Sequence, residues 1–147
     1  MYRATLLSLL ILISCYSPSE ERANEKFNDL ANYYSNVLNL SLPKNGIIII
    51  LQNQRCSSCR LSTFLRLSQL LKSNILPKTF LLSKNDSTLI NIISTIPNKV
   101  VLFDTENIRK DYGLDYATDL VFLLKESKLK NWFELSNANL DNLKSIE

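Results

Sequence analysis

The chain has 147 residues, with 17 basic and 14 acidic side chains and no histidine. This length suits one domain with its own core, and a net charge of +3 without a basic block gives no electrostatic footprint for nucleic acid. The absence of histidine excludes Ser-His and Cys-His nucleophilic catalysis and removes the commonest zinc and copper ligand.

The N-terminal segment has the form of an export signal. Arg3 precedes an apolar run over residues 4–13, which is too short to span a bilayer but suits a secretory signal. The sequence LISC at residues 12–15 resembles the lipobox of bacterial lipoproteins. That resemblance implies cleavage before Cys15, lipid on its thiol, and a protein held to a membrane of the cell envelope, outside the cytoplasm. An ordinary signal peptide or a short apolar anchor that contains a cysteine is the alternative.

The rest of the chain is predicted to alternate between helices and strands. Apolar residues at helical spacing predict a helix over 20–39, with Ser19 as its N-cap. The wholly apolar run from Ile47 to Leu51 predicts a central strand covered on both faces. Later patterns predict helices at 57–73 and 87–96, strands at 79–82 and 100–103, a helical turn or two at 108–112, a hairpin of strands 120–124 and 130–135 around a turn at 126–128, and a last helix marked by Leu140, Leu143 and Ile146.

These elements predict an α/β fold. Strands separated by helices pair in parallel, whereas a terminal hairpin adds an antiparallel edge to the sheet. The expected architecture is a three-layer sandwich with a central mixed sheet and an extra N-terminal helix. We therefore divide the chain into a signal peptide at 1–14, a lipidated tether at 15–22 and one domain at 23–147.

The sequence RCSSCR at residues 55–60 is the candidate for reactive chemistry. If Cys15 carries lipid, Cys56 and Cys59 remain as an even pair in a compartment where disulfides persist. The pair lies where a predicted strand ends and a helix begins, and the helix N-terminus favours thiolate over thiol. Arg55 and Arg60 would add positive charge. Cys56 is then expected to be the attacking thiol and Cys59, one helical turn later, the resolving thiol.

Over roughly residues 45–147 the chain resembles the thioredoxin-like superfamily. The segments that carry the resemblance are IIIILQNQRCSSC, VVLFD, IRKDYGL, DLVFLL and KNWFEL. Within the superfamily the chain is most similar to exported, membrane-tethered thiol–disulfide proteins that have an added helix before the first strand and an insertion in the middle. The resemblance implies a cofactor-free and metal-free exchange of disulfides with protein partners through the cysteine pair.

Three positions depart from this family. Arg55 stands where an aromatic residue usually precedes the first cysteine, and Ile50 stands where many members have a buried acid. Thr118-Asp119 aligns with the place where a cis-proline usually precedes the third core strand. An acidic Asp119 close to the thiols would oppose thiolate formation. We therefore expect Arg55, Arg60, Thr118 and Asp119 to modulate the reactivity of the pair.

Other interpretations of the pair stay open. The cysteines could form a structural disulfide, or an inert thiol pair, in a binding or scaffolding lipoprotein. A metal site is disfavoured because two thiolates without His or Met cannot complete a tetrahedral shell. A peroxide-reducing protein is disfavoured by Asn53, where such proteins usually have threonine. Elsewhere, we expect Trp132 and Phe133 to pack against the terminal helix rather than dock a partner, and Asp104 to be an exposed carboxylate at a strand end.

Overall fold

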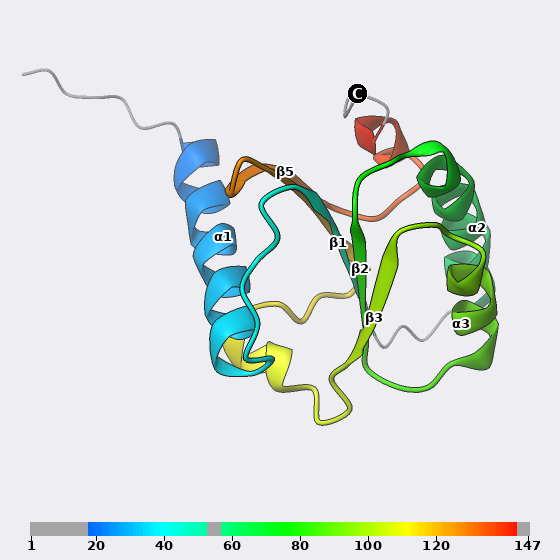
Figure 1. Cartoon of the computed structure of the whole chain (residues 1–147), viewed down its shortest axis with the longest axis horizontal. Helices are drawn as coiled ribbons and strands as arrows, with labels where there is room; N and C mark the ends of the chain where they lie inside the picture. The colour runs from blue at the N-terminus through cyan, green and yellow to red at the C-terminus, as the bar shows by residue number, and fades with distance from the viewer. Residues whose placement is uncertain (1–17, 53–56, 144–147) are drawn as a thin grey trace, which may run out of the picture.

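The computed structural model describes residues 18–52 and 57–143, with the backbone alone at 18–20 and 57–59. Its centre is a sheet of five strands in the order β3-β2-β1-β4-β5 (Figure 1). The strands are β1 (Gly46–Leu51), β2 (Lys78–Leu82), β3 (Lys99–Phe103), β4 (Leu120–Lys125) and β5 (Lys128–Glu134). The first three strands run parallel, whereas β4 is antiparallel to β1 and β5 is antiparallel to β4.

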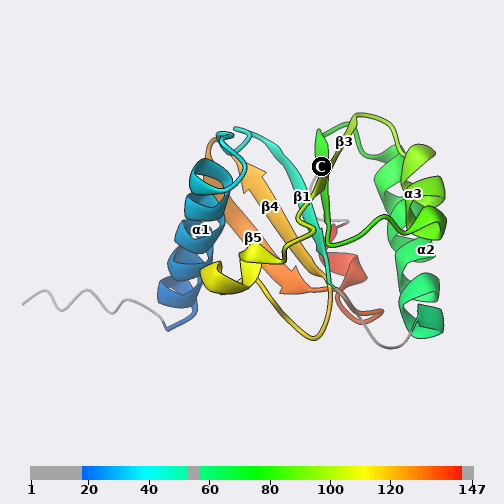
Figure 2. The same cartoon turned by 90° about the horizontal axis from the view of Figure 1, so that it is seen from below.

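Helices cover both faces of this sheet (Figure 2). One face carries α2 (Ser57–Ser73), α3 (Ser87–Ser94) and the short 3-10 helix η2 (Leu140–Leu143), and the other carries α1 (Pro18–Asn36) and the 3-10 helix η1 (Ile108–Tyr112). The helices α2 and α3 are the crossovers that parallel pairing of β1, β2 and β3 requires. This arrangement confirms the three-layer, thioredoxin-like sandwich with a mixed sheet, an antiparallel C-terminal hairpin and an added N-terminal helix.

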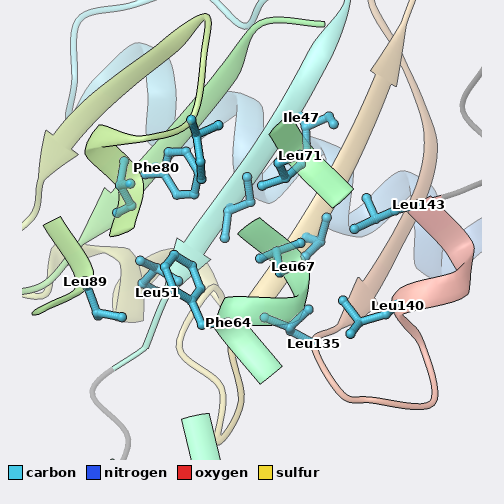
Figure 3. Packing of buried hydrophobic residues seen from close by; sticks show 14 of the residues in the cluster. Ile47, Leu51, Phe64, Leu67, Leu71, Phe80, Leu89, Leu135, Leu140 and Leu143 are labelled. Atoms are coloured by element: carbon cyan, nitrogen blue, oxygen red, sulfur yellow. The ribbon is translucent and has the colours of Figure 1, made fainter. Parts of the chain in front are cut away.

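Strand β1 is the centre of both halves of the core. Its alternate residues point to opposite faces, so Ile49 and Leu51 pack on the α2 side while Ile48 and Ile50 pack on the α1 side. Figure 3 shows Leu51 beside Phe64 of α2 on the first of these faces. Because every residue of β1 is buried, the prediction of a strand covered on both faces is confirmed.

Glycine is required where β1 begins. A Cβ on Gly46 would lie 2.9 Å from the carbonyl oxygen of Pro77, the oxygen that accepts the Ile47 N–H at 2.9 Å. This close approach of two backbones leaves no room for a side chain.

Several element ends differ from the sequence-based prediction. The first helix begins at Pro18, so Ser19 lies in its first turn and not at the N-cap, which agrees with the tolerance of helix starts for proline. The last element is a single 3-10 turn rather than a regular helix, and Ile146 lies outside the described residues. The hairpin turn consists of Glu126 and Ser127, both with positive φ, and Lys128 already belongs to β5, as in the tight two-residue turns that suit twisted strands.

The two aromatic residues of β5 pack on different faces of the sheet. Phe133 lies in the core with Leu140 and Leu143, so the expected packing against the terminal element is confirmed for it. Trp132 lies on the opposite face, stacked on Phe122 with ring centroids 6.3 Å apart and edge-on to Tyr116 at 6.1 Å. The expectation was wrong for Trp132 because neighbouring residues of one strand point to opposite faces.

Candidate functional site

The predicted cysteine pair falls between the end of β1 and the first turn of α2. Strand β1 ends at Leu51 and α2 begins at Ser57, so Cys59 lies in the first turn of that helix. Cys56 and Arg55 lie outside the described residues, as do Cys15 and Asn53, and no side chain is described for Cys59. Among the described residues at this junction, the end of β1 and the first turns of α2 both contact Asp119.

Asp119 directly precedes β4, and its side chain is only 1% exposed. One carboxylate oxygen, Oδ1, accepts the backbone N–H of Gln52 at 2.7 Å. The Arg60 guanidinium binds the same carboxylate through Nε at 3.1 Å and Nη2 at 3.2 Å. The antiparallel register that pairs Ile50 with Leu120 places the two strand ends side by side, which explains why the Gln52 N–H reaches this carboxylate.

The structure therefore brings together two of the predicted modulators, Arg60 and Asp119, as an ion pair. Bidentate Arg–carboxylate pairs combine charge-assisted hydrogen bonds with a fixed geometry, and here the Arg60 side chain is only 10% exposed. Each of these two charges therefore has an opposite charge within hydrogen-bond distance. Thr118 is not part of this contact, because its hydroxyl donates to the carboxylate of Glu134 on β5.

Gln52 is a residue that the sequence analysis missed. It is buried, and its side-chain Nε2 donates to the carbonyl oxygen of Leu114 at 2.8 Å while its backbone N–H binds Asp119. The available signal was the change from the apolar run IIIIL to a polar residue at position 52. Gln52 therefore links the end of β1 both to Asp119 and to the loop that precedes β4.

Asp104, expected to be exposed, is buried. Its Oδ1 accepts the N–H of Ile108 at 2.9 Å and its Oδ2 accepts the N–H of Arg109 at 3.0 Å, so the carboxylate caps η1. The expectation was wrong because these bonds satisfy N–H groups that the start of a short helix leaves unpaired.

Arg109 is fully buried beneath α1. Burial lowers the pKa of its guanidinium, and the nearby Asp104 carboxylate opposes that effect. Tyr33 of α1 is also fully buried, and burial together with the charge of Asp104 raises the pKa of its hydroxyl. No local sequence pattern predicted that Tyr33, Asp104 and Arg109 would meet in the interior.

A shallow pocket adjoins the first turns of α2 and α3. Leu51, Leu82 and Leu89 form its apolar part, and Arg60 and Lys84 are among its charged residues. At its edge the Asp86 carboxylate caps α3 by accepting the N–H groups of Thr88 and Leu89 at 3.1 Å. The carboxyl ends of parallel strands are where α/β folds commonly place ligand sites, and this pocket lies at that end of β1 and β2.

Among residues 18–52 and 57–143, no group of three or more His, Cys, Asp or Glu side chains is placed to hold a metal ion. In the same part of the chain, no helix is long and apolar enough to cross a membrane.

Comparison with known proteins gives one similar structure. No protein-family model and no curated protein matches the chain. A crystal structure assigned as the thiol:disulfide interchange protein DsbE of Chlorobium tepidum aligns with a TM-score of 0.45 and 16% identity, over 69% of this chain and 75% of that one. The fold assignment rests on the strand order, the strand directions and the crossovers rather than on this likeness.

Proposed function

We propose that the protein is a thiol–disulfide oxidoreductase of the cell envelope, anchored by lipid on Cys15 and exchanging disulfides through Cys56 and Cys59. The observation that carries the proposal is the position of the CSSC sequence, between β1 and the first turn of α2 in a thioredoxin-like sandwich. A thiol at a helix N-terminus meets unpaired N–H groups and the positive end of the helix dipole. Its partners are protein thiols and disulfides.

The exchange proceeds in two balanced steps. The Cys56 thiolate attacks one sulfur of a partner disulfide, which forms a mixed disulfide and releases the other partner sulfur as a thiolate that takes up a proton. The Cys59 thiolate then attacks the Cys56 sulfur and releases the second partner thiol. Two electrons pass to the partner, and Cys56 and Cys59 end as a disulfide; the reverse sequence oxidises a partner dithiol.

One observation favours a second candidate, a binding or scaffolding lipoprotein with a structural disulfide. An ion pair between Arg60 and Asp119 occupies the place where active members of the family usually have a cis-proline. A structural disulfide would have a reduction potential below about −300 mV, whereas exchange-active pairs lie above that value.

Reduction of insulin disulfides by the purified protein tests the proposed activity. We expect the wild-type chain to be active and Cys56→Ser to abolish activity, because the attacking sulfur is gone. Cys59→Ser should instead accumulate a mixed disulfide with the substrate, because the resolving sulfur is gone. An inactive wild-type protein whose potential lies well below about −300 mV would favour the structural disulfide.

A further inference from the structure

We infer that β3 is an interaction surface, through which the protein forms a two-fold symmetric dimer by pairing β3 antiparallel to β3 of a second copy. The inference goes beyond the proposed function and does not depend on it, because β2 separates this edge of the sheet from β1 (Figure 1). It rests on the backbone groups, the exposed side chains and the charges of β3.

The outer edge of β3 has backbone groups without a partner strand. In the strand order β3 has β2 on one side, and no described strand pairs with its other side. At the two ends of the ladder the Lys78 N–H donates to the Asn98 carbonyl oxygen and the Asp104 N–H donates to the Leu82 carbonyl oxygen, both at 2.8 Å. In the parallel register between these bonds, alternate residues of β3 bond to β2. The N–H and C=O groups of residues 99, 101 and 103 therefore point away from the sheet.

Apolar side chains are uncovered at this same edge. Val100 is 55% exposed and Phe103 is 47% exposed, although both belong to a strand of the sheet. Ile75, which is 85% exposed, adjoins the start of β3, because its carbonyl oxygen accepts the Asn98 side-chain N–H at 3.2 Å. Three of the five exposed large apolar residues in the described part of the chain thus belong to one region. Apolar residues gathered in this way indicate an interaction site, whereas scattered ones do not.

The opposite edge of the sheet has the protection that β3 lacks. Strand β5 carries Lys128, Lys130 and Glu134, and its ladder with β4 has a register shift next to Leu124. Charged side chains and bulges are devices that keep an edge strand from pairing with another chain. In β3 the only charged residue is Lys99, at the first position, and its register with β2 is uninterrupted. The difference between the two edges favours β3 as a strand that pairs.

The spacing of the free backbone groups selects one register. Because residues 99, 101 and 103 are symmetric about Val101, an antiparallel pair with Val101 opposite Val101 of the second copy uses all of their N–H and C=O groups. This register places Val100 opposite Leu102 of the second copy. Leu102 already packs on the core beneath α1, so the exposed Val100 gains an apolar neighbour on that face. On the other face it places Phe103 opposite Lys99.

The charges of β3 favour a second copy in this orientation. Lys99 Nζ donates to the carbonyl oxygens of Ser94 at 2.9 Å and Ile96 at 3.0 Å, and no ion pair of Lys99 occurs among the described residues. The start of β3 is therefore positive, whereas the exposed Glu106 makes the region after its end negative. Antiparallel pairing brings the positive start of each strand toward the negative end of the other. Parallel pairing would instead bring like charges together, which is unfavourable.

Sedimentation velocity of the purified full chain measures the association. The chain carries Cys15→Ser, so that no lipid adds an apolar contact. We expect a monomer–dimer equilibrium between micromolar and near-millimolar concentrations, because one pair of strands buries an area at the low end for protein interfaces. Leu65→Lys is the matched control: it replaces a similarly exposed apolar side chain on α2 and should leave the equilibrium unchanged.

Two substitutions of Phe103 distinguish the proposed register from unspecific apolar association. Phe103→Lys places a lysine opposite Lys99 of the second copy, whereas Phe103→Glu removes the same apolar side chain but places a carboxylate there. The dissociation constant should be roughly tenfold higher for Phe103→Lys than for Phe103→Glu, because like charges opposite each other in a sheet repel. Equal dissociation constants for the two variants would overturn the register.

Cross-linking at position 101 tests the same register without measuring affinity. Directly opposite residues in a hydrogen-bonded antiparallel pair have Cα atoms about 5.5 Å apart, a distance that a disulfide spans. In a chain whose own three cysteines are replaced by serine, Val101→Cys should form an intermolecular disulfide under mild oxidation. Val100→Cys should not, because it lies opposite Leu102 rather than opposite itself. Circular dichroism checks that each variant is folded.

Val101→Pro, made in the Cys15→Ser chain, should abolish the dimer. It removes an outward N–H and leaves the ladder to β2 intact, which edge strands tolerate. A chain that stays monomeric at every concentration and gives no cross-link at position 101 would overturn the inference, and an extended segment of another protein would then be the occupant to test. Cross-linking of Val100→Cys in place of Val101→Cys would also overturn it, as would a dimer that folded Val101→Pro retains.

Discussion

Arg109 carries a guanidinium into the interior without a hydrogen bond to any of its three side-chain nitrogens among the described residues. Asp104, the acid with the largest effect on the pKa of Arg109, directs its two oxygens to backbone N–H groups of η1. Its negative charge therefore compensates Arg109 only across space, and burial lowers the pKa of the guanidinium. A buried cation without hydrogen bonds lowers the stability of the folded state. Asp104 beside it, in contrast, accepts two hydrogen bonds of normal length.

This difference predicts opposite results for two substitutions. Arg109→Met keeps an apolar stem of similar length and removes the buried charge, so the free energy of unfolding should stay level or rise by about 1 kcal/mol. Asp104→Asn should lower it by about 1 to 3 kcal/mol, because the cap weakens and the cation loses its counter-charge. Urea denaturation followed by circular dichroism measures both. A loss above about 3 kcal/mol for Arg109→Met would show that the guanidinium has a strong partner.

For individual residues, the sequence was a good guide to which side chains carry charged or reactive groups. It was a poor guide to where those side chains lie in the fold. Charged side chains are usually exposed, and nothing local to Asp104 or Arg109 shows that tertiary contacts bury them. The same holds for the ion pair of Arg60 and Asp119, because these residues are far apart in sequence and meet only through the register of β1 and β4.

Helix α1 is an integral layer of the fold. Leu30, Tyr33 and Tyr34 are buried between this helix and the sheet, and burial raises the pKa of the Tyr34 hydroxyl to about 12. At its rim Lys26 donates to Asp29 at 2.9 Å and to the carbonyl oxygen of Gly113 at 3.0 Å. The helix therefore packs against the core and is hydrogen-bonded to the loop that leads to Asp119.

Truncation of a single residue tests how far the domain depends on this helix. Leu30→Ala should lower the free energy of unfolding by about 2 to 5 kcal/mol, since a fully buried leucine leaves a cavity. Leu65→Ala, on α2, is the comparison because that side chain is 43% exposed and should cost under about 1 kcal/mol. Equal losses for the two variants would mean that α1 contributes no core of its own.

The sequence predicted the type and bounds of elements that have a long apolar pattern. It predicted short elements less well. The apolar stripe of α2 gave its bounds, Ser57–Ser73, and the uninterrupted run of β1 gave a doubly covered strand. The 3-10 turn at Leu140–Leu143 is too short to have a period of its own. Its apolar residues therefore indicated burial correctly but not the type of helix.

For the molecule as a whole, the sheet separates α1 from α2. Helix α1, which begins at Pro18 soon after Cys15, lies on one face of the sheet, and α2 lies on the other (Figure 2). If lipid holds Cys15, the anchored helix and the thiol-bearing helix are thus different layers of the domain. The anchor and the exchange chemistry can then be tested independently.

The anchor predicts that Cys15→Ser moves the protein from the membrane fraction to the soluble fraction when it is produced in a bacterium. It also predicts labelling of the wild-type chain by radioactive palmitate and loss of that label in Cys15→Ser, because the acceptor thiol is missing. Cys56→Ser is the control and should keep the label. Wild-type protein without label would contradict the anchor, as would equal labelling of Cys15→Ser.

The central position of β1 also determines how the chain can fold. Its partner on one side, β2, follows after a single helix, but its partner on the other side, β4, is synthesised only after β3 and η1. Until β4 docks, the GIIIIL strand has an open edge and no charged residue to protect it. Pairing across such a long stretch of chain is slow, because loop closure precedes any gain from the contact. The arrival of β4, which also brings Asp119 to Arg60, closes this edge and so ends the period in which another chain could pair with β1.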